Sequence, residues 1–169
     1  MKQTDNFKFD EVNVMNELVY RNLSEDAKRQ ICAWKYGGEY DLYNLPSYEE
    51  MQVRQIGFMN PQREKNYYGF WDESILVGFV NILEEKEEVF IGIGVNPDLC
   101  NKHYGQRMLL ITYEISKKLY PDKPLYLEVR TWNIRAVKCY QKAGFRIDGQ
   151  AYELTTGIGT GTFYRMIRE

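Results

Sequence analysis

The sequence predicts a mixed α/β fold, a sheet with helices on its faces, and three observations lead to this prediction. Two segments with the apolar spacing of helices come first, at 24–36 and from residue 47 onward. The apolar period then changes to that of strands over three successive segments. A helix, a strand, a second helix and two closing strands complete the chain.

The first part of the chain begins with a short predicted strand at 17–22, with the sequence ELVYRN. Ser24 then caps the first helix, whose first turn carries acidic residues at the positive end of the helix dipole. Two glycines that follow the helix end it. The second helix begins at Ser47 and ends before the Asn60-Pro61 pair, because a residue that precedes proline avoids the helical conformation.

The middle of the chain carries three strand-like segments joined by short turns, at 66–72, 74–85 and 87–95. Gly92 and Gly94 lie inside the third of these segments. Glycine weakens a strand unless another group must approach the backbone closely. These two glycines therefore mark either such an approach or a bulge without function.

The last part of the chain alternates helices and strands. Its first helix has one apolar face, and Asn133 caps its second helix. A glycine-rich run at 155–161 has no helix after it, so it predicts a flexible hairpin loop and not a phosphate-binding loop. The predicted elements are helices at 103–119 and 133–144 and strands at 124–130, 145–149 and 162–168.

The composition excludes several classes of partner. The net charge is −2, and the pI is about 5.6. This balance has no basic surplus that would favour nucleic acid or an anionic membrane, so neither partner is predicted. The three cysteines are odd in number and lack metal-ligand spacing, which argues against a disulfide scaffold and against a zinc site. We expect no metal.

The polar and weakly patterned residues 1–16 predict a loose extension, and 17–169 has a length that suits one domain. The first residues contain no apolar signal region, and no span reaches the length of a membrane helix. Together with the use of cysteine, these features lead us to expect a cytoplasmic protein.

The turn NPDLCNKHYGQRMLL at 96–110 has the features of an anion site. A strand ends at Val95, Pro97 breaks the loop, and a helix begins near His103. Free backbone N–H groups and the helix dipole would then face one point, and neighbouring basic side chains add charge. The alternative is a plain strand–helix connection with solvated polar residues.

A second stretch, LYLEVRTWNIRAVKCYQKAGFRIDG at 125–149, carries a specific spacing after a strand. The residues that carry it are the LEVR run at 127–130, Asn133, Ala136, Tyr140 and the pair Gly144-Phe145. This pattern resembles the GNAT superfamily of acetyl-CoA-dependent N-acetyltransferases. The resemblance implies a GNAT-like fold with a central, mostly antiparallel sheet, helices on both faces, and splayed strands at 87–95 and 124–130. It also implies acetyl-CoA as the co-substrate.

The pyrophosphate loop departs from the family pattern of Gln or Arg, two residues, Gly, one residue, and Gly or Ala. These positions are Cys100, His103 and Gly105, and only Gly105 matches. Asparagine and histidine tolerate left-handed backbone better than most residues, so Asn101 and His103 still allow a tight turn. His103 either donates to a phosphate or is an exposed residue at the helix start.

The resemblance implies a set of contacts with the coenzyme. They comprise the splayed strand, the loop and the following helix start, and the motif helix. The implied residues are Ile93, Gly94, Val95, Cys100, Asn101, Lys102, His103, Tyr104, Gly105, Gln106, Asn133, Ala136 and Tyr140.

The resemblance also implies catalytic roles. Tyr140 stands where the family places the tyrosine that donates a proton to the leaving sulfur, and Glu128 stands where some members place their general base. A main-chain N–H near Val95 would polarise the thioester carbonyl. The alternatives are a packed aromatic for Tyr140 and an ion-paired strand residue for Glu128.

The acceptor is less readable from the sequence. Trp34, Tyr36 and Tyr40 lie in the segment with which the family shapes its acceptor pocket. With Glu39 and Asp41 they would suit a cationic amine, although packing of two helices on the sheet explains the aromatic residues equally well. A polyamine, an amino acid, an aminoglycoside-like drug and a peptide N-terminus all remain open, and dimers are common in the family.

Three functions compete. The first is an N-acetyltransferase that acts on a small-molecule amine or a peptide N-terminus by direct transfer, because no cysteine or serine has a base beside it in the pattern. The second is a degenerate module of the same family that senses acyl-CoA or has lost catalysis, which the altered loop motivates. The third is an interaction protein, which only the aromatic residues favour.

Overall fold

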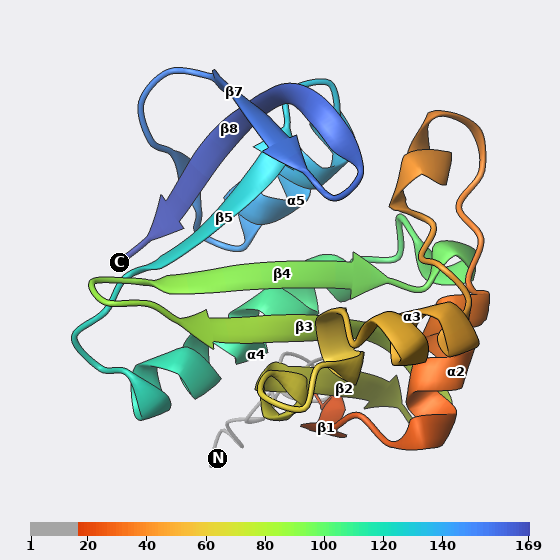
Figure 1. Ribbon diagram of the computed structural model, residues 1–169. Helices are drawn as coiled ribbons and strands as arrows, with labels where there is room; N and C mark the ends of the chain where they lie inside the picture. Colours follow the sequence, from red (N-terminus) through yellow and green to blue (C-terminus); the bar gives the residue numbers. More distant parts are fainter. Residues whose placement is uncertain (1–16) are drawn as a thin grey trace, which may run out of the picture.

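The computed structural model describes residues 17–169, and the predicted extension at 1–16 lies outside the described residues. Its strands are β1 (Val19–Asn22), β2 (Tyr67–Asp72), β3 (Ile75–Glu84), β4 (Val89–Val95), β5 (Leu125–Arg130), β6 (Arg146–Ile147), β7 (Tyr152–Thr156) and β8 (Gly159–Arg168). They form one sheet in the order β1-β2-β3-β4-β5-β8-β6, and β7 also pairs with β8 (Figure 1). Only the β4–β5 pair is parallel within residues 17–169, which confirms the predicted mixed and mostly antiparallel sheet.

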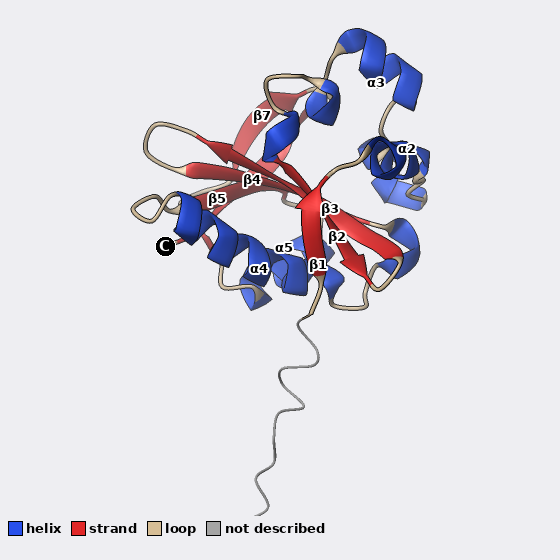
Figure 2. Cartoon of the chain, turned by 90° about the horizontal axis from the view of Figure 1, so that it is seen from below, coloured by secondary structure: helices blue, strands red, loops and turns tan. Residues whose placement is uncertain are grey.

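The helices cover both faces of this sheet. They are α2 (Glu25–Ala33), α3 (Tyr48–Arg54), α4 (Tyr104–Leu119) and α5 (Ile134–Lys142), and short 3₁₀ turns include η1 (Gly38–Tyr43) and η4 (Pro97–Leu99). Figure 2 shows α4 and α5 on one side of the strands and α2 and α3 on the other. Within residues 17–169, no helix is both long enough and apolar enough to cross a bilayer.

Two apolar clusters hold these layers together. The larger one packs Met108 and Leu109 of α4 against Ile91, Leu125 and Leu127 on one face of the sheet. The smaller one lies on the opposite face, where α2 and α3 pack on β2 and β3; it is formed by Ala27, Ile31, Cys32, Tyr48, Met51, Phe58, Trp71 and Leu76. Burial of both clusters supplies the main driving force that keeps the helices on the sheet.

Strands β4 and β5 share only a short ladder. Their pairing consists of Val89 with Leu125 and Phe90 with Tyr126, whereas β3 pairs with β4 along the whole of β4. The two strands therefore separate after Phe90, as Figure 1 shows. The splayed strands that the family resemblance implies are present, and one backbone edge of β4 is left without a β5 partner.

Both N-terminal helices are shorter than the sequence pattern predicts. The first ends at Ala33, because Trp34 is already extended and its ring packs against Phe79 at 6.3 Å between centroids. The second ends at Arg54, and Gln55 takes a left-handed conformation with φ of 50°. In both places contacts with the sheet override the local helical pattern.

The glycine-rich run at 155–161 is mostly strand. The expected flexible loop is limited to the tight turn between Thr156 and Gly159, and β7 and β8 extend through the rest of the run. Strand β7 is absent from the sequence-based prediction because its five residues, YELTT, carry a weak apolar alternation. Pairing with β8 stabilises it instead.

Candidate active site

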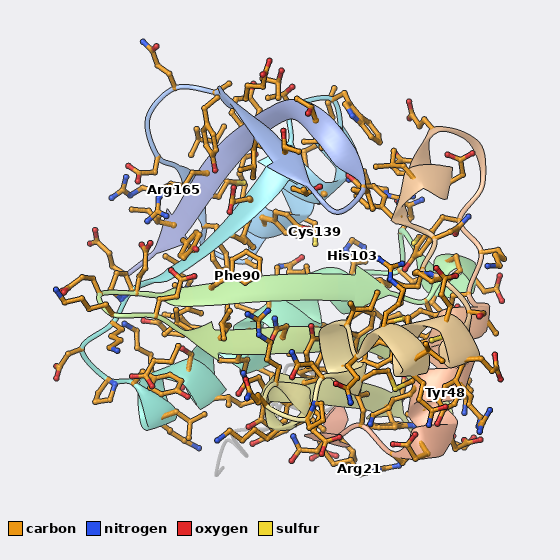
Figure 3. The ribbon with its side chains drawn as sticks, viewed as in Figure 1. Arg21, Tyr48, Phe90, His103, Cys139 and Arg165 are labelled. Atoms are coloured by element: carbon orange, nitrogen blue, oxygen red, sulfur yellow. The ribbon has the colours of Figure 1, made fainter. Side chains whose placement is uncertain are left out.

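A cavity of about 610 Å³ opens where β4 and β5 separate. Figure 3 shows Phe90, Cys139 and His103 along this opening, between β4 and the segment formed by β5 and α5. All of the predicted coenzyme contacts line the cavity except Lys102, and both predicted catalytic residues line it. Of the predicted acceptor contacts, Trp34 and Tyr36 line it, whereas Tyr40 does not.

The unpaired part of β4 forms one wall of the cavity. Its pairing with β3 has no register shift, so the glycines in this strand do not mark a bulge. A Cβ atom at Gly94 would lie 2.4 Å from the ring of Phe79, which packs across the strand. Of the two explanations offered for glycine in this strand, Gly94 therefore fits the close approach to the backbone. The group that approaches is the ring of Phe79.

The turn before α4 has the backbone of a tight anion loop without its glycines. Asn101 and His103 have φ of 63° and 64°, so both take the left-handed conformation that the sequence analysis allowed. Among residues 17–169, no side chain caps the N-terminus of α4, which leaves the first N–H groups of this 16-residue helix at the cavity lined by Tyr104, Gly105 and Gln106. Such a helix end favours an anion.

Gly105 allows the start of α4 to pack closely on α5. A Cβ atom at this position would lie 3.0 Å from the Sγ atom of Cys139 and 3.5 Å from Val95. The one glycine of the loop that matches the family pattern thus serves helix–helix packing. Because it keeps α4 close to α5, it brings the free N–H groups and the motif helix to the same cavity.

Helix α5 adds positive charge that the sequence analysis missed. Arg135, Lys138 and Lys142 all line the cavity. Their spacing of three and four residues places them on one side of a helix, and this spacing was the available signal. A cluster of cations beside a helix N-terminus raises the local attraction for phosphate groups.

Tyr140 lies half-buried on α5 and faces the cavity. Burial raises the pKa of its phenol well above the usual range, and the neighbouring Cys139 raises this pKa further. The phenol is therefore protonated at neutral pH. A protonated and poorly solvated hydroxyl is a suitable proton donor to an anionic leaving group.

Glu128 lies on β5 and accepts a hydrogen bond from the hydroxyl of Tyr152 at 2.6 Å, through its Oε2 atom. Burial and this hydrogen bond raise the pKa of Tyr152, so the tyrosine remains a donor. Tyr152 reaches Glu128 because β7 and β5 flank β8, where Phe163 pairs with both Tyr152 and Arg130. No motif in the sequence pointed to Tyr152.

Asn133 combines two structural tasks at the start of α5. Its side-chain oxygen accepts from the N–H of Ala136 at 3.2 Å, which makes it the N-cap that the sequence predicted. Its Nδ2 atom donates to the hydroxyl of Tyr43 at 3.2 Å. Asn133 therefore joins the motif helix to η1, and Tyr43, which belongs to the aromatic segment expected to shape the acceptor pocket, also lines the cavity.

Tyr36 closes the cavity near the end of β4. Its hydroxyl donates to the carbonyl oxygen of Val95 at 2.7 Å. Tyr40 lies beside this wall, where it packs on Trp132 at 5.7 Å between ring centroids and beneath the guanidinium of Arg135. Glu39 and Asp41 are exposed and do not line the cavity, so they do not provide the acidic acceptor wall that the sequence suggested.

Comparisons with known proteins fit this geometry. No curated protein sequence matches the chain. A spermidine N-acetyltransferase from Vibrio cholerae, solved with CoA and spermine, has a TM-score of 0.70 at 18% identity, over 89% of this chain and 94% of that one. A GNAT-family acetyltransferase from Streptococcus pneumoniae has a TM-score of 0.65 at 23% identity, over 90% and 98%.

A third solved structure, AAC(6′)-Ib with paromomycin and acetyl-CoA, has a TM-score of 0.65 at 16% identity, over 88% of this chain and 92% of that one. At these identities the likeness concerns the fold. The model of the acetyltransferase (GNAT) family matches residues 19–145, which is well over half of the 169 residues. The chain therefore belongs to the acetyltransferase (GNAT) family.

Proposed function

We propose that the chain transfers an acetyl group from acetyl-CoA to a primary amine, by direct attack within a ternary complex. One observation carries this proposal: a continuous cavity joins the free N-terminus of α4 to Glu128 and Tyr140. The cavity thus offers a place for an anionic carrier at one end and two groups able to move protons at the other.

The residues present fit coenzyme A. The N–H groups at the start of α4 would bind its pyrophosphate, and the cations of α5 would bind the remaining phosphate charge. The backbone of β4 beyond Phe90 has no β5 partner and would pair with the pantetheine arm. When bound, acetyl-CoA supplies the acetyl group as a thioester.

Glu128 would act as the base toward the acceptor. A lysine-like amine has a pKa near ~10.4, so its deprotonation at pH 7 costs about 4–5 kcal/mol. Tyr152 occupies Oε2 of Glu128, which leaves Oε1 to accept a proton from the ammonium group, directly or through a water. The hydrogen bond from Tyr152 would also fix the orientation of the carboxylate.

Tyr140 would act as the acid. Its phenol lies on the cavity wall and stays protonated because burial raises its pKa. It would donate this proton to the sulfur that leaves when the amine displaces it. A main-chain N–H of β4 would stabilise charge on the acetyl oxygen, in the manner of an oxyanion hole.

An acceptor screen tests the proposed function. Purified protein, acetyl-CoA and a panel of amines that includes amino acids, polyamines, aminoglycosides and peptides are combined, and free thiol is measured over time. We expect thiol release that depends on one class of amine. Binding of coenzyme A in calorimetry, with no release above the hydrolysis rate for any amine, would support the acyl-CoA sensor instead.

A further inference from the structure

Arg130 is a buried cation near Glu128, at the end of the cavity where the proposed function places the acceptor amine. It is the last residue of β5 and lies two positions after Glu128, so both side chains project from the same face of the strand. The residue is only 8% exposed, yet it lines the cavity. Burial of a charge is costly unless the charge is paired and hydrogen-bonded.

The contacts of Arg130 within the protein compensate this cost poorly. Its Nη1 and Nη2 atoms reach the carbonyl oxygens of Thr160 and Gly159 at 3.4 Å each, which is long for an N–H···O bond. Its Nε atom is buried and has no hydrogen-bond partner among residues 17–169. None of the ion pairs formed within that range includes Arg130.

The neighbouring strand makes room for this guanidinium. A Cβ atom at Gly161 of β8 would lie 2.1 Å from Nη1 of Arg130, so any larger residue would displace the guanidinium. The ring of Phe163 lies beneath it, with 5.0 Å between Cζ and the ring centroid. Gly161 and Phe163 therefore hold the guanidinium in a fixed position at the cavity. Its N–H groups that lack a good acceptor would be satisfied by an anion.

The other charges that line the cavity indicate which molecule carries that anion. In the proposed function the phosphates of the coenzyme bind at the start of α4 and at the cations of α5. Helix α4 packs with Leu125 and Leu127 of β5, and the alternation of side chains along a strand places Arg130 on the opposite face of β5. Glu128 is the one acidic residue that lines the cavity within residues 17–169. A multiply charged cation such as a polyamine would thus meet one carboxylate and a buried arginine, which is an unfavourable match.

We propose that Arg130 binds a carboxylate of the acceptor, and that the acceptor is a small amine that carries this carboxylate. The amine would lie at Glu128 and the carboxylate at Arg130. Side chains two residues apart on a strand are separated by roughly 7 Å along the chain, which suits the two charged ends of an amino acid. Arginine binds a carboxylate through two parallel hydrogen bonds. This inference rests on the proposed function, because it names the substrate of the same site.

Binding of matched conjugates tests this inference without relying on turnover. The probes are coenzyme A joined through an acetyl bridge to glycine, β-alanine or γ-aminobutyrate, each prepared also as the neutral carboxamide. Calorimetry with the wild-type protein should show that one carboxylate conjugate binds at least about 30-fold more tightly than its carboxamide, as expected for a buried charge pair. Equal affinities in all three pairs would overturn the inference.

Two variants locate the effect. In Arg130→Gln the preference for the carboxylate should fall to about 1-fold, whereas Arg135→Gln, on the coenzyme side, should weaken both members of a pair equally and keep their ratio. A preference that survives in folded Arg130→Gln would contradict the assignment. If circular dichroism shows that Arg130→Gln does not fold, the inference is judged from the wild-type protein by its ratio of affinities for the carboxylate and carboxamide conjugates.

Two further measurements complete the test: the first identifies the kind of carboxylate that binds, and the second separates this inference from the proposed function. A conjugate of aspartic acid α-amide distinguishes a side-chain carboxylate of a peptide from the carboxylate of a free amino acid. A preference for the carboxylate conjugate in binding, with no thiol release from any amine, would contradict the proposed acetyl transfer but support the anion site at Arg130. Thiol release at equal rates from an amino acid and from its amide would contradict the anion site at Arg130 and leave the proposed acetyl transfer supported.

Discussion

At the scale of single residues, the candidate chemistry depends on tyrosines. Tyr140 and Tyr152 both have pKa values raised by burial, yet they stand in different relations to the reaction. Tyr140 faces the cavity, whereas Tyr152 donates to Glu128. We therefore expect the first to act on the leaving group and the second to orient the base.

Replacement of Tyr140 by phenylalanine tests the acid. The ring still fills its place on α5, but the proton donor is lost, so kcat should fall by roughly 10²–10⁴-fold while the dissociation constant of acetyl-CoA changes little. Steady-state kinetics and calorimetry measure the two quantities. Tyr43→Phe serves as the control, since it removes a cavity hydroxyl bonded to Asn133. An unchanged kcat in Tyr140→Phe would exclude this tyrosine as the acid.

Glu25 links single-residue charge to stability. Hydrogen bonds from Lys28 and then Tyr48 lower the pKa of its carboxyl group in the folded protein. Because the folded pKa lies below the unfolded value near ~4.3, the stabilisation is fully present above that value and is lost as pH falls through the lowered folded pKa. The side chain is 62% exposed, so solvent screening keeps the gain below about 1 kcal/mol.

Glu25→Gln should therefore lower the free energy of unfolding at pH 7, and the loss should be smaller at about pH 3, because the stabilisation from the ionised carboxyl group declines as pH falls below the unfolded pKa toward the lowered folded pKa. Urea unfolding at the two pH values measures the difference. Glu49→Gln is a suitable control, because within the described part of the chain the side chain of Glu49 makes an exposed ion pair with Arg29 and no other. Equal losses in Glu25→Gln at both pH values would show that its contacts with Lys28 and Tyr48 do not depend on charge.

At the scale of elements, the turn between β4 and α4 shows that different residue types can adopt the same left-handed backbone. The family pattern uses glycine, whereas this chain places asparagine and histidine in the left-handed conformation. Such residues cost roughly 1–3 kcal/mol each when their backbone is strained, and asparagine costs least among residues with a Cβ. Apart from Pro97, the residues of the turn keep their N–H groups, because only proline lacks one.

His103→Gly separates the two roles that remain open for this side chain. Glycine relieves the left-handed backbone, so the free energy of unfolding should rise by up to about 1 kcal/mol, whereas His103→Val should lower it. If the imidazole also donates to a phosphate, the affinity for coenzyme A falls in His103→Gly although the stability rises. Chemical denaturation and calorimetry distinguish these outcomes. A less stable His103→Gly would contradict the assignment of strain.

At the scale of the whole molecule, the cavity exists because two helix layers hold a sheet whose middle pair of strands diverges. The coenzyme would bridge β4, α4 and α5, which belong to different parts of the chain. Binding at such a junction should stabilise the entire fold. The coenzyme would contribute about 2.7 kcal/mol at 100 times its dissociation constant.

Thermal unfolding with and without coenzyme A measures this effect. We expect the Tm to rise by roughly 5–10 °C at that ligand excess, since 1 kcal/mol shifts the Tm by about 2–4 °C for a domain of this size. Desulfo-coenzyme A should give a similar shift because it keeps the phosphates. Adenosine, which lacks them, should give a smaller one. No shift with coenzyme A at millimolar concentration would favour a family member that does not bind it.

The sequence by itself determined the features that depend on near neighbours. The cap at Asn133, the change of apolar period and the left-handed tolerance of Asn101 and His103 act within a few residues, so they are visible in the chain. The spacing after the LEVR run was visible for the same reason. These features were sufficient to predict the mixed sheet and the family.

Only the tertiary structure decided which side chains meet across strands. Tyr152 reaches Glu128 from 24 residues away, through a strand whose own sequence carries a weak pattern. The room that Gly161 leaves for Arg130 likewise arises from the pairing of β5 with β8, as does the lack of a hydrogen-bond partner for its Nε atom among residues 17–169. Strand register is set by packing of the whole sheet, and no short stretch of sequence contains that information.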